Sequence, residues 1–295
     1  MRTVVRKQNM IRILLFIFLV ILFHQTKGQD KIEDLFQRAE EHFEKEELDS
    51  ALLLYHFISE NFKEHPSVPE AIYNKAYIFN RIDEKEKAKK IFIQFLKSDF
   101  SEKHSGPGEG IMSEPFSLFK HRAANHLAEI YLDEKRFRRA LKYTKLAEFK
   151  YPYIHFCGNE IEANEIYFAV LYSRCYDGLG KKDKAISLLW DHIFYYGLAS
   201  NTIAVEQIAT LLKDQFSKME LEMEIIGAIQ KIEITSDNSQ IAEATIEIFG
   251  EKIELPDYPP LWRENFEMMK QLKYGSKEWF EYVYKSSLFY EIILK

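Results

Sequence analysis

Small residues recur at matched places along much of the chain, and their spacing restricts the fold more than any other feature of the sequence. The reference points are Ala51, Ala88, Ala140 and Ala185. Another small residue stands twelve positions before each of them, in order Ala39, Ala76, Ala128 and Ser173. Nine positions before the reference alanines are His42, Phe79, Tyr131 and Tyr176, and four positions after them are Tyr55, Phe92, Thr144 and Leu189. Small side chains let two helices approach closely while large ones fill the space beside them. The pattern therefore predicts a unit that is repeated four times.

Each unit is expected to be a pair of antiparallel helices. Apolar residues recur every three or four positions on both sides of a polar break, as in AIYNKAYIFNRIDEKEKAKKIFIQFL from residue 71 to 96. Breaks such as EKRFRR and DGLGKKDK leave room only for a tight turn. The 295 residues include only 11 Gly and 8 Pro, which favours long helices over many short strands. We expect an all-α array over residues 29–198, with inserts near 101–116 and 152–159.

The repeated unit resembles the tetratricopeptide repeat (TPR), a 34-residue helix-turn-helix unit. The third unit carries most of the signature, with Ala128, Tyr131, Ala140, Ala147 and the closing Pro152. The first unit departs from it because His42 stands where the family has an aromatic residue. The resemblance covers roughly residues 32–197. It implies a right-handed helical solenoid with a C-terminal cap.

The resemblance also implies a concave groove that is lined by the first helix of each unit and holds a protein or peptide. Carried over residue by residue, the groove positions are Tyr73, Tyr77, Asn80, Arg81, Arg122, Asn125, Glu129 and Arg174. Asparagine can bond the backbone of an extended peptide, arginine can pair with carboxylates, and tyrosine can cover apolar side chains. The alternative is that these positions form the ordinary solvated face of amphipathic helices.

Residues 199–295 lose the repeat signature and are expected to form the cap. The segments KIEIT, TIEIF and KIEL alternate apolar and polar residues, as strands do. They favour a small β-hairpin near 231–255, with Gly250 and Glu251 in its turn. A helix over 237–249 is the competing interpretation.

Two helices are expected after the hairpin. Pro260 and Gly275 bracket the first, and Ser276 is placed to cap a final helix that is rich in aromatic residues. We expect these helices to complete the cap, because the last unit of a solenoid leaves a face that must be covered.

The first 28 residues differ from the rest and predict a secretory signal peptide. Four basic residues precede an apolar run from Ile13 to Phe23, and a cut is expected after Gly28. An uncleaved membrane anchor is the alternative, although the run is shorter than the roughly 20 residues that a spanning helix needs. The leader holds five basic and no acidic residues, so its removal changes the formal net charge from −6 to −11. A chain that acidic is a poor ligand for nucleic acid or anionic lipid.

No group of residues has the spacing typical of a catalytic, cofactor or metal site. His155 lies near Cys157, but a thiol nucleophile needs a base placed in space, and the surrounding loop shows no sign of one. The glycine-rich segment at 106–110 lacks the Lys-Ser/Thr of a phosphate-binding loop. His121 and His126 are five positions apart, which places them on different faces of a helix.

The two cysteines, Cys157 and Cys175, are expected to be free and buried, although an exported chain can hold disulfides. Residues 160–178 read as one continuous helix. Such a helix would hold the two sulfurs more than about 20 Å apart, beyond bonding reach.

The sequence therefore predicts a non-enzymatic, protein-binding scaffold in the periplasm, the cell envelope or the secreted space. The alternative is a glycan-binding or enzymatic role of the C-terminal region, in which YPPLW at 258–262 and Trp279 offer a stacking surface. A third possibility places the last helix at a membrane interface, but that helix lacks a strongly basic polar face.

Overall fold

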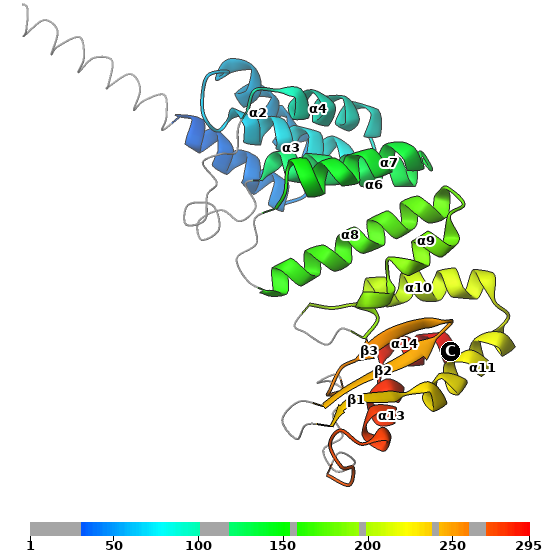
Figure 1. Ribbon diagram of the computed structural model, residues 1–295. Coiled ribbons are helices and arrows are strands. Elements are labelled where there is room, and N and C mark those ends of the chain that lie inside the picture. The colour runs from blue at the N-terminus through cyan, green and yellow to red at the C-terminus, as the bar shows by residue number, and fades with distance from the viewer. Residues whose placement is uncertain (1–30, 101–117, 154–157, 195–198, 238–241, 260–269) are drawn as a thin grey trace, which may run out of the picture. The chain divides into compact units, whose positions relative to one another are not determined.

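The computed structural model describes residues 31–100, 118–153, 158–194, 199–237, 242–259 and 270–295, most of which are helical (Figure 1). The described residues divide into two compact units. The first holds residues 31–100 and 118–123, and the second begins at Ala124. The leader, the insert at 101–116 and most of the segment between Pro260 and Gly275 lie outside the described residues.

The helices follow one another as adjacent pairs. In the first unit a helix over residues 31–44 precedes α2, and α3 precedes α4; α6 with α7 and α8 with α9 continue the series. Their bounds are α2 Leu48–Asn61, α3 Val68–Arg81, α4 Lys85–Lys97, α6 Phe119–Asp133, α7 Phe137–Lys145, α8 Gly158–Gly178 and α9 Lys182–Ser187. A π-helical turn, η1 (Leu146–Lys150), extends α7. The described residues thus contain the four helix pairs that the sequence predicts.

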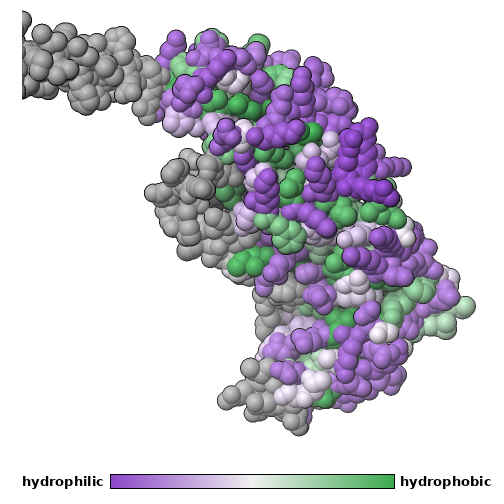
Figure 2. Space-filling model, turned by 45° about the horizontal axis from the view of Figure 1, so that its top comes forward, coloured by the Kyte–Doolittle hydropathy of each residue, from purple (hydrophilic) through white to green (hydrophobic). Residues whose placement is uncertain are grey.

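The small residues of the repeat lie inside these pairs. All eight are completely buried: Ala39, Ala51, Ala76, Ala88, Ala128, Ala140, Ser173 and Ala185. Large rings fill the neighbouring space, since Tyr73 of α3 packs against Phe92 of α4 and Tyr131 of α6 stacks on Tyr143 of α7. Hydrophilic side chains cover most of the visible surface of the helices, and hydrophobic ones show mainly between them (Figure 2). Burial of the small residues confirms the packing that their spacing predicts.

All four pairs turn through the same backbone geometry. The residue five positions before the reference alanine has a positive φ of 55° to 72°, and these residues are Glu46, Asp83, Lys135 and Gly180. The next residue donates its N–H to the carbonyl oxygen five positions earlier, over 2.8–2.9 Å in every pair. This 6→1 bond and the left-handed residue define a Schellman motif, which satisfies the last carbonyls of the first helix. The tight turns that the sequence predicts are confirmed.

The aromatic column of the repeat lies beside these turns. Lys87 lies over Phe79, Arg139 over Tyr131 and Lys184 over Tyr176, with 4.3–5.5 Å between the cation and the ring centroid. The first pair lacks this contact, because His42 replaces the aromatic residue and its Nδ1 lies 2.5 Å from a carboxylate oxygen of Glu47. The departure of the first unit is therefore compensated by a polar contact across the same turn.

The second unit ends in helices and a three-stranded antiparallel sheet of order β1-β2-β3 (Figure 1). Its elements are η2 Trp190–His192, α10 Thr202–Gln215, α11 Lys218–Gly227, η3 Ala228–Lys231, β1 Glu233–Asp237, β2 Ala242–Ile248, β3 Glu251–Leu255, α13 Lys277–Lys285 and α14 Leu288–Leu294. One hydrophobic core joins residues of α8, α9, α10, the sheet, α13 and α14. Residues 199–295 therefore share a core with the fourth helix pair.

The strands confirm the β interpretation of this region, and the competing helix over 237–249 is wrong. The turn differs by one residue from the expected one, because Ile248 pairs with Glu251 and leaves Phe249 and Gly250 between the strands. Both have positive φ, 51° and 82°, as a type I′ turn requires. Phe249 tolerates this conformation because its ring packs 4.7 Å from that of Phe216 and its N–H donates to Glu224.

The last aromatic-rich segment forms two helices rather than the single helix that was expected. Ser276 begins α13 by accepting a hydrogen bond from the N–H of Trp279, as predicted. The helix stops before Ser287, whose extended backbone and side-chain bond to the N–H of Tyr290 start α14. Within the described ranges, no helix is both long and apolar enough to cross a membrane.

Candidate functional site

The predicted groove residues of the first unit do not all face outward. Tyr73 is completely buried, so the prediction that it lines a groove is wrong. Its ring packs 5.9 Å from that of Phe92 and 5.3 Å from that of Phe119. Tyr73 points into the contact between helices because it stands three residues before the packing residue Ala76, on the same side of α3.

The remaining predicted residues of this unit contact one another through aromatic and ionic groups. Arg81 places its guanidinium over the ring of Phe43, and its Nη2 lies 3.0 Å from a carboxylate oxygen of Glu46. Tyr77 packs against the same phenylalanine. Arg122 lies over the ring of Tyr73, 4.6 Å from its centroid. Asn80, half-buried on α3, accepts the N–H of Asp83 at its carbonyl oxygen in the turn. Most of these side chains therefore already have partners within the unit.

The second unit holds the other three predicted residues, Asn125, Glu129 and Arg174. The hydroxyl of Tyr167 on α8 donates to Glu129 over 2.9 Å, and Nδ1 of His126 lies 3.7 Å from the same carboxylate. Burial opposes the ionisation of Glu129, but the hydrogen bonds from His126 and Tyr167 outweigh it and lower the pKa of this carboxyl. Arg174 is exposed on α8 and favours the same ionised form. Glu129 thus links the third helix pair to the fourth.

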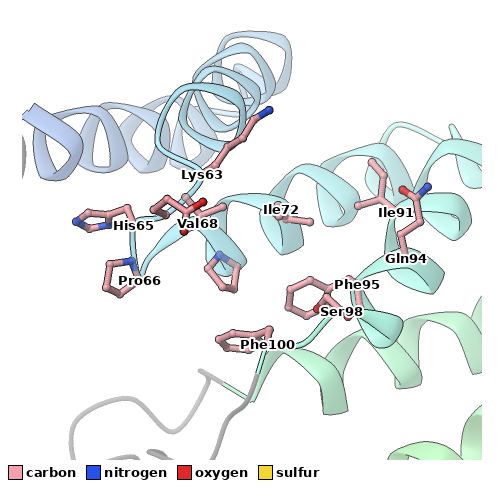
Figure 3. Close-up of a pocket in the computed structure, with 12 residues that line it drawn as sticks. Lys63, His65, Pro66, Val68, Ile72, Ile91, Gln94, Phe95, Ser98 and Phe100 are labelled. Carbon is pink, nitrogen blue, oxygen red and sulfur yellow. Dashed lines mark hydrogen bonds between the residues drawn. The ribbon is translucent and has the colours of Figure 1, made fainter.

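A cleft that the sequence did not predict opens in the first unit beside α3 and α4 (Figure 3). Its volume is about 610 Å³. The lining residues are Lys63, Glu64, His65, Pro66, Val68, Pro69, Ile72, Ile91, Gln94, Phe95, Ser98 and Phe100. Figure 3 shows Ile72 of α3 and Phe95 of α4 reaching toward the same space, with His65 and Pro66 at one end and Ile91 and Gln94 at the other. We call it the α3–α4 cleft.

A proline, hydrogen bonds and a ring contact restrict the segments that line the α3–α4 cleft. Pro69 stands in the first turn of α3, where a residue without an N–H costs the helix nothing. Just before it, Ser67 donates its backbone N–H to Nδ1 of His65. Beyond α4, Lys120 donates to the carbonyl oxygen of Ser98 over 2.7 Å, and the ring of Phe100 packs against that of Phe95. The cleft is therefore largely formed before any ligand enters, which reduces the ordering cost of binding.

The chemistry of this cleft suits an apolar group. Most of its lining consists of proline, valine, isoleucine and phenylalanine side chains, and a few polar and charged residues complete it. Figure 3 shows one of these, Ser98, beside Phe95. Concave, mostly apolar sites of about 300–1,000 Å³ with a few polar groups are typical binding sites. Two signals in the sequence could have indicated it: prolines around the start of a helix, and Ile72 and Ile91 on faces that the repeat leaves unpaired.

A second cleft of about 430 Å³ lies between α2, α3 and α4. It shares Ile91 and Gln94 with the α3–α4 cleft. Leu52 and Leu53 of α2 and Phe79 of α3 supply more of its apolar lining. We call it the α2–α4 cleft. The two clefts therefore lie next to each other at α4 in the first unit.

The structure gives no support for a thiol nucleophile, a metal site or a stacking surface among the described residues. Cys175 is a free and buried thiol, as predicted, and burial raises its pKa to about 11. Cys157 and His155 lie outside the described residues. In the described part of the chain, no three His, Cys, Asp or Glu side chains are grouped as metal ligands. Trp279 is 4% exposed and donates its ring N–H to the carbonyl of Asp257, so the expectation that it offers a stacking surface is wrong.

Comparison with known proteins supplies no relative. No protein-family model, no curated protein and no solved structure matches the chain. Functional inference therefore rests on the geometry of the two clefts and of the helix pairs that form them.

Proposed function

We propose that this chain is a non-enzymatic, exported scaffold of TPR-like helix pairs that holds a segment of a partner protein in the α3–α4 cleft. The observation that carries the proposal is a preformed, mostly apolar cleft of about 610 Å³ with a few polar groups in its lining. The repeated helix pairs with identical turns support the relation to TPR units, which bind proteins. The basic and apolar pattern of residues 1–28 supports export.

The α3–α4 cleft is a better binding site than the face of the first helices, where the sequence places the groove. On that face Arg81 is engaged with Glu46 and Phe43, and Arg122 with Tyr73. A ligand would have to replace these contacts, which reduces the net gain of binding. In the α3–α4 cleft, apolar groups such as Ile72 are only partly covered, and a partner side chain would remove more of their surface from water.

A protein segment fits this site better than a compact small molecule. The α3–α4 cleft is open to solvent and shares Ile91 and Gln94 with the α2–α4 cleft. An extended or helical segment can place successive apolar side chains in two adjacent clefts. The proposed role is therefore that of an adaptor, and the partner brings whatever chemistry the complex performs.

Affinity capture from envelope and secreted fractions, with the full chain as bait, tests this proposal. The Ile72→Glu variant should lose its partner by tenfold or more, because a carboxylate would be buried in an apolar contact. Ile203→Glu is the matched control, since Ile203 is 45% exposed on α10 of the second unit. Thermal unfolding of both variants reports whether the fold is intact.

A third bait combines Tyr77→Ala, Arg81→Ala and Asn125→Ala, three of the residues that the sequence places in the groove. The proposal predicts that this bait keeps most of its partner. If the triple variant lost the partner and Ile72→Glu retained it, the partner would bind the face of the first helices. That result would contradict binding in the α3–α4 cleft.

A further inference from the structure

The α2–α4 cleft has an unusual charge for this chain. Its lining includes Lys75, Lys87, Lys90 and His56 but no carboxylate, although the formal net charge of the whole chain is −6. The lining also includes the apolar side chains of Leu52, Leu53, Phe79 and Ile91. A cleft that is cationic in an acidic protein attracts a narrow class of ligand.

The ammonium groups of the three lysines differ in the contacts that they form. Lys87 pairs with Glu84 over 3.0 Å and lies over the ring of Phe79, so its charge is already used. Lys75 places Nζ 3.4 Å from Nδ1 of His56. Within the residues that the structure describes, neither Lys75 nor Lys90 forms an ion pair with a carboxylate.

The acidic groups around the cleft do not remove this charge. On α2, Glu60 lies 4.0 Å from Nδ1 of His56, its side chain is 54% exposed, and it does not line the cleft. At the start of α4, Glu84 pairs with Lys87 and Glu86 pairs with Lys89. Lys90 is exposed on α4, one residue before Ile91. Lys75 of α3 and Lys90 of α4 therefore line the same cleft as Leu52, Phe79 and Ile91.

We propose that the α2–α4 cleft accepts the acidic part of the same partner segment, with an apolar side chain on Leu52, Phe79 and Ile91 and carboxylates on Lys75 and Lys90. This inference rests on the proposed function and names the chemistry of the partner: a segment that is apolar where it enters the α3–α4 cleft and alternates apolar and acidic residues where it crosses α4. Charge-assisted hydrogen bonds orient such a segment and reject a basic one.

A displayed library of random dodecapeptides, selected on the full chain, tests the inference. We expect the selected peptides to be enriched in Asp and Glu beside Leu, Ile or Phe. Two of them, labelled with a fluorophore, are then titrated against Lys75→Gln/Lys90→Gln and against Lys31→Gln/Lys45→Gln. The second variant loses the same charge from exposed lysines of the first unit that line neither cleft.

The Lys75→Gln/Lys90→Gln variant should bind about fivefold more weakly, which corresponds to two exposed ion pairs of about 0.5 kcal/mol each. The control should change by less than twofold, and added salt should weaken only the wild type and the control. Peptides without an acidic preference, or equal binding by the two double variants, would overturn the inference. If the selected peptides had no acidic preference but still bound Ile72→Glu more weakly than the wild type, the proposed function would be supported without this inference. If no selected peptide bound Ile72→Glu more weakly than the wild type, both proposals would be overturned.

Discussion

The helix pairs and the C-terminal region begin their helices in different ways. In the four pairs, the second helix follows a left-handed residue and has no side-chain cap. In the C-terminal region, α11, α13 and α14 each begin at a serine whose hydroxyl accepts a backbone N–H, at Ser217, Ser276 and Ser287. The second helices of the pairs therefore start through a backbone turn, whereas α11, α13 and α14 start through individual serine side chains. The matched left-handed position holds Glu46, Asp83, Lys135 or Gly180 in the four pairs.

The largest effect should come from enlarging a small residue inside a pair. Ala140→Leu forces a branched side chain into a completely buried contact, beside the stacked rings of Tyr131 and Tyr143. We expect a loss of about 1–3 kcal/mol in the free energy of unfolding, measured by urea denaturation. Lys145→Leu, at an exposed position of the same helix, is the control. Equal effects of the two changes would mean that the alanine column does not set the packing of the pair.

Two opposite substitutions test whether the turns are equivalent. Gly180→Ala has room for its methyl group but must adopt a φ of +72°, so it should destabilise the chain by about 1 kcal/mol. Lys135→Gly, at the matching position of the third pair, removes the same strain and should stabilise by up to about 1 kcal/mol. Chemical denaturation of both variants gives the signs. Two changes of the same sign would break the equivalence between the turns.

Removal of a cap tests the other half of the comparison. Ser287→Ala leaves the N–H of Tyr290 without its acceptor and should cost about 1 kcal/mol. The neighbouring Ser286→Ala removes a hydroxyl that forms no cap and should change stability by less than 0.5 kcal/mol, on the order expected of a substitution away from such features. Thermal unfolding of the two variants is sufficient. A similar change in both would assign the cost to burial rather than to capping.

The smallest effect concerns the side-chain bond between the third and fourth pairs. Because the folded pKa of Glu129 is lowered, its stabilisation is present above the unfolded pKa and is lost as the pH falls through the folded value. Glu129→Gln should therefore cost less than about 1 kcal/mol at pH 7, since the carboxylate is 45% exposed. The difference between wild type and variant should shrink below pH 4.5. If the stability difference between wild type and Glu129→Gln were constant from pH 7 to pH 3, the ionised carboxylate would not be its cause.

Much of the fold could be predicted because its main determinants are local in sequence. The spacing of small residues identifies the four pairs, and the alternation in residues 231–255 identifies the strands. The hairpin turn was misplaced by one residue because the register depends on cross-strand pairing, which places Phe249 rather than Glu251 in the turn. Within the aromatic run at the C-terminus, the end of α13 depends on the buried position of Ser287, which periodicity does not reveal.

The site was harder to predict than the fold. Tyr73 and Tyr77 are one turn apart on α3, and the sequence does not distinguish the buried ring from the half-buried one. The α3–α4 cleft depends on segments that meet in space: the loop before α3, the first half of α3, the second half of α4 and the residues up to Phe100. No single segment carries its pattern. The sequence also does not reveal the left-handed backbone of Glu46, Asp83 and Lys135, because glycine is the residue expected at such positions.

Photo-crosslinking inside the source cell would show directly whether the α3–α4 cleft holds the partner. A photoreactive phenylalanine analogue would replace Ile72 in the cleft, Tyr77 on the face of the first helices, or the exposed Lys145 of α7. If the α3–α4 cleft holds the partner, position 72 gives an adduct with one defined protein and position 145 gives none. An adduct from position 77 without one from position 72 would contradict binding in this cleft.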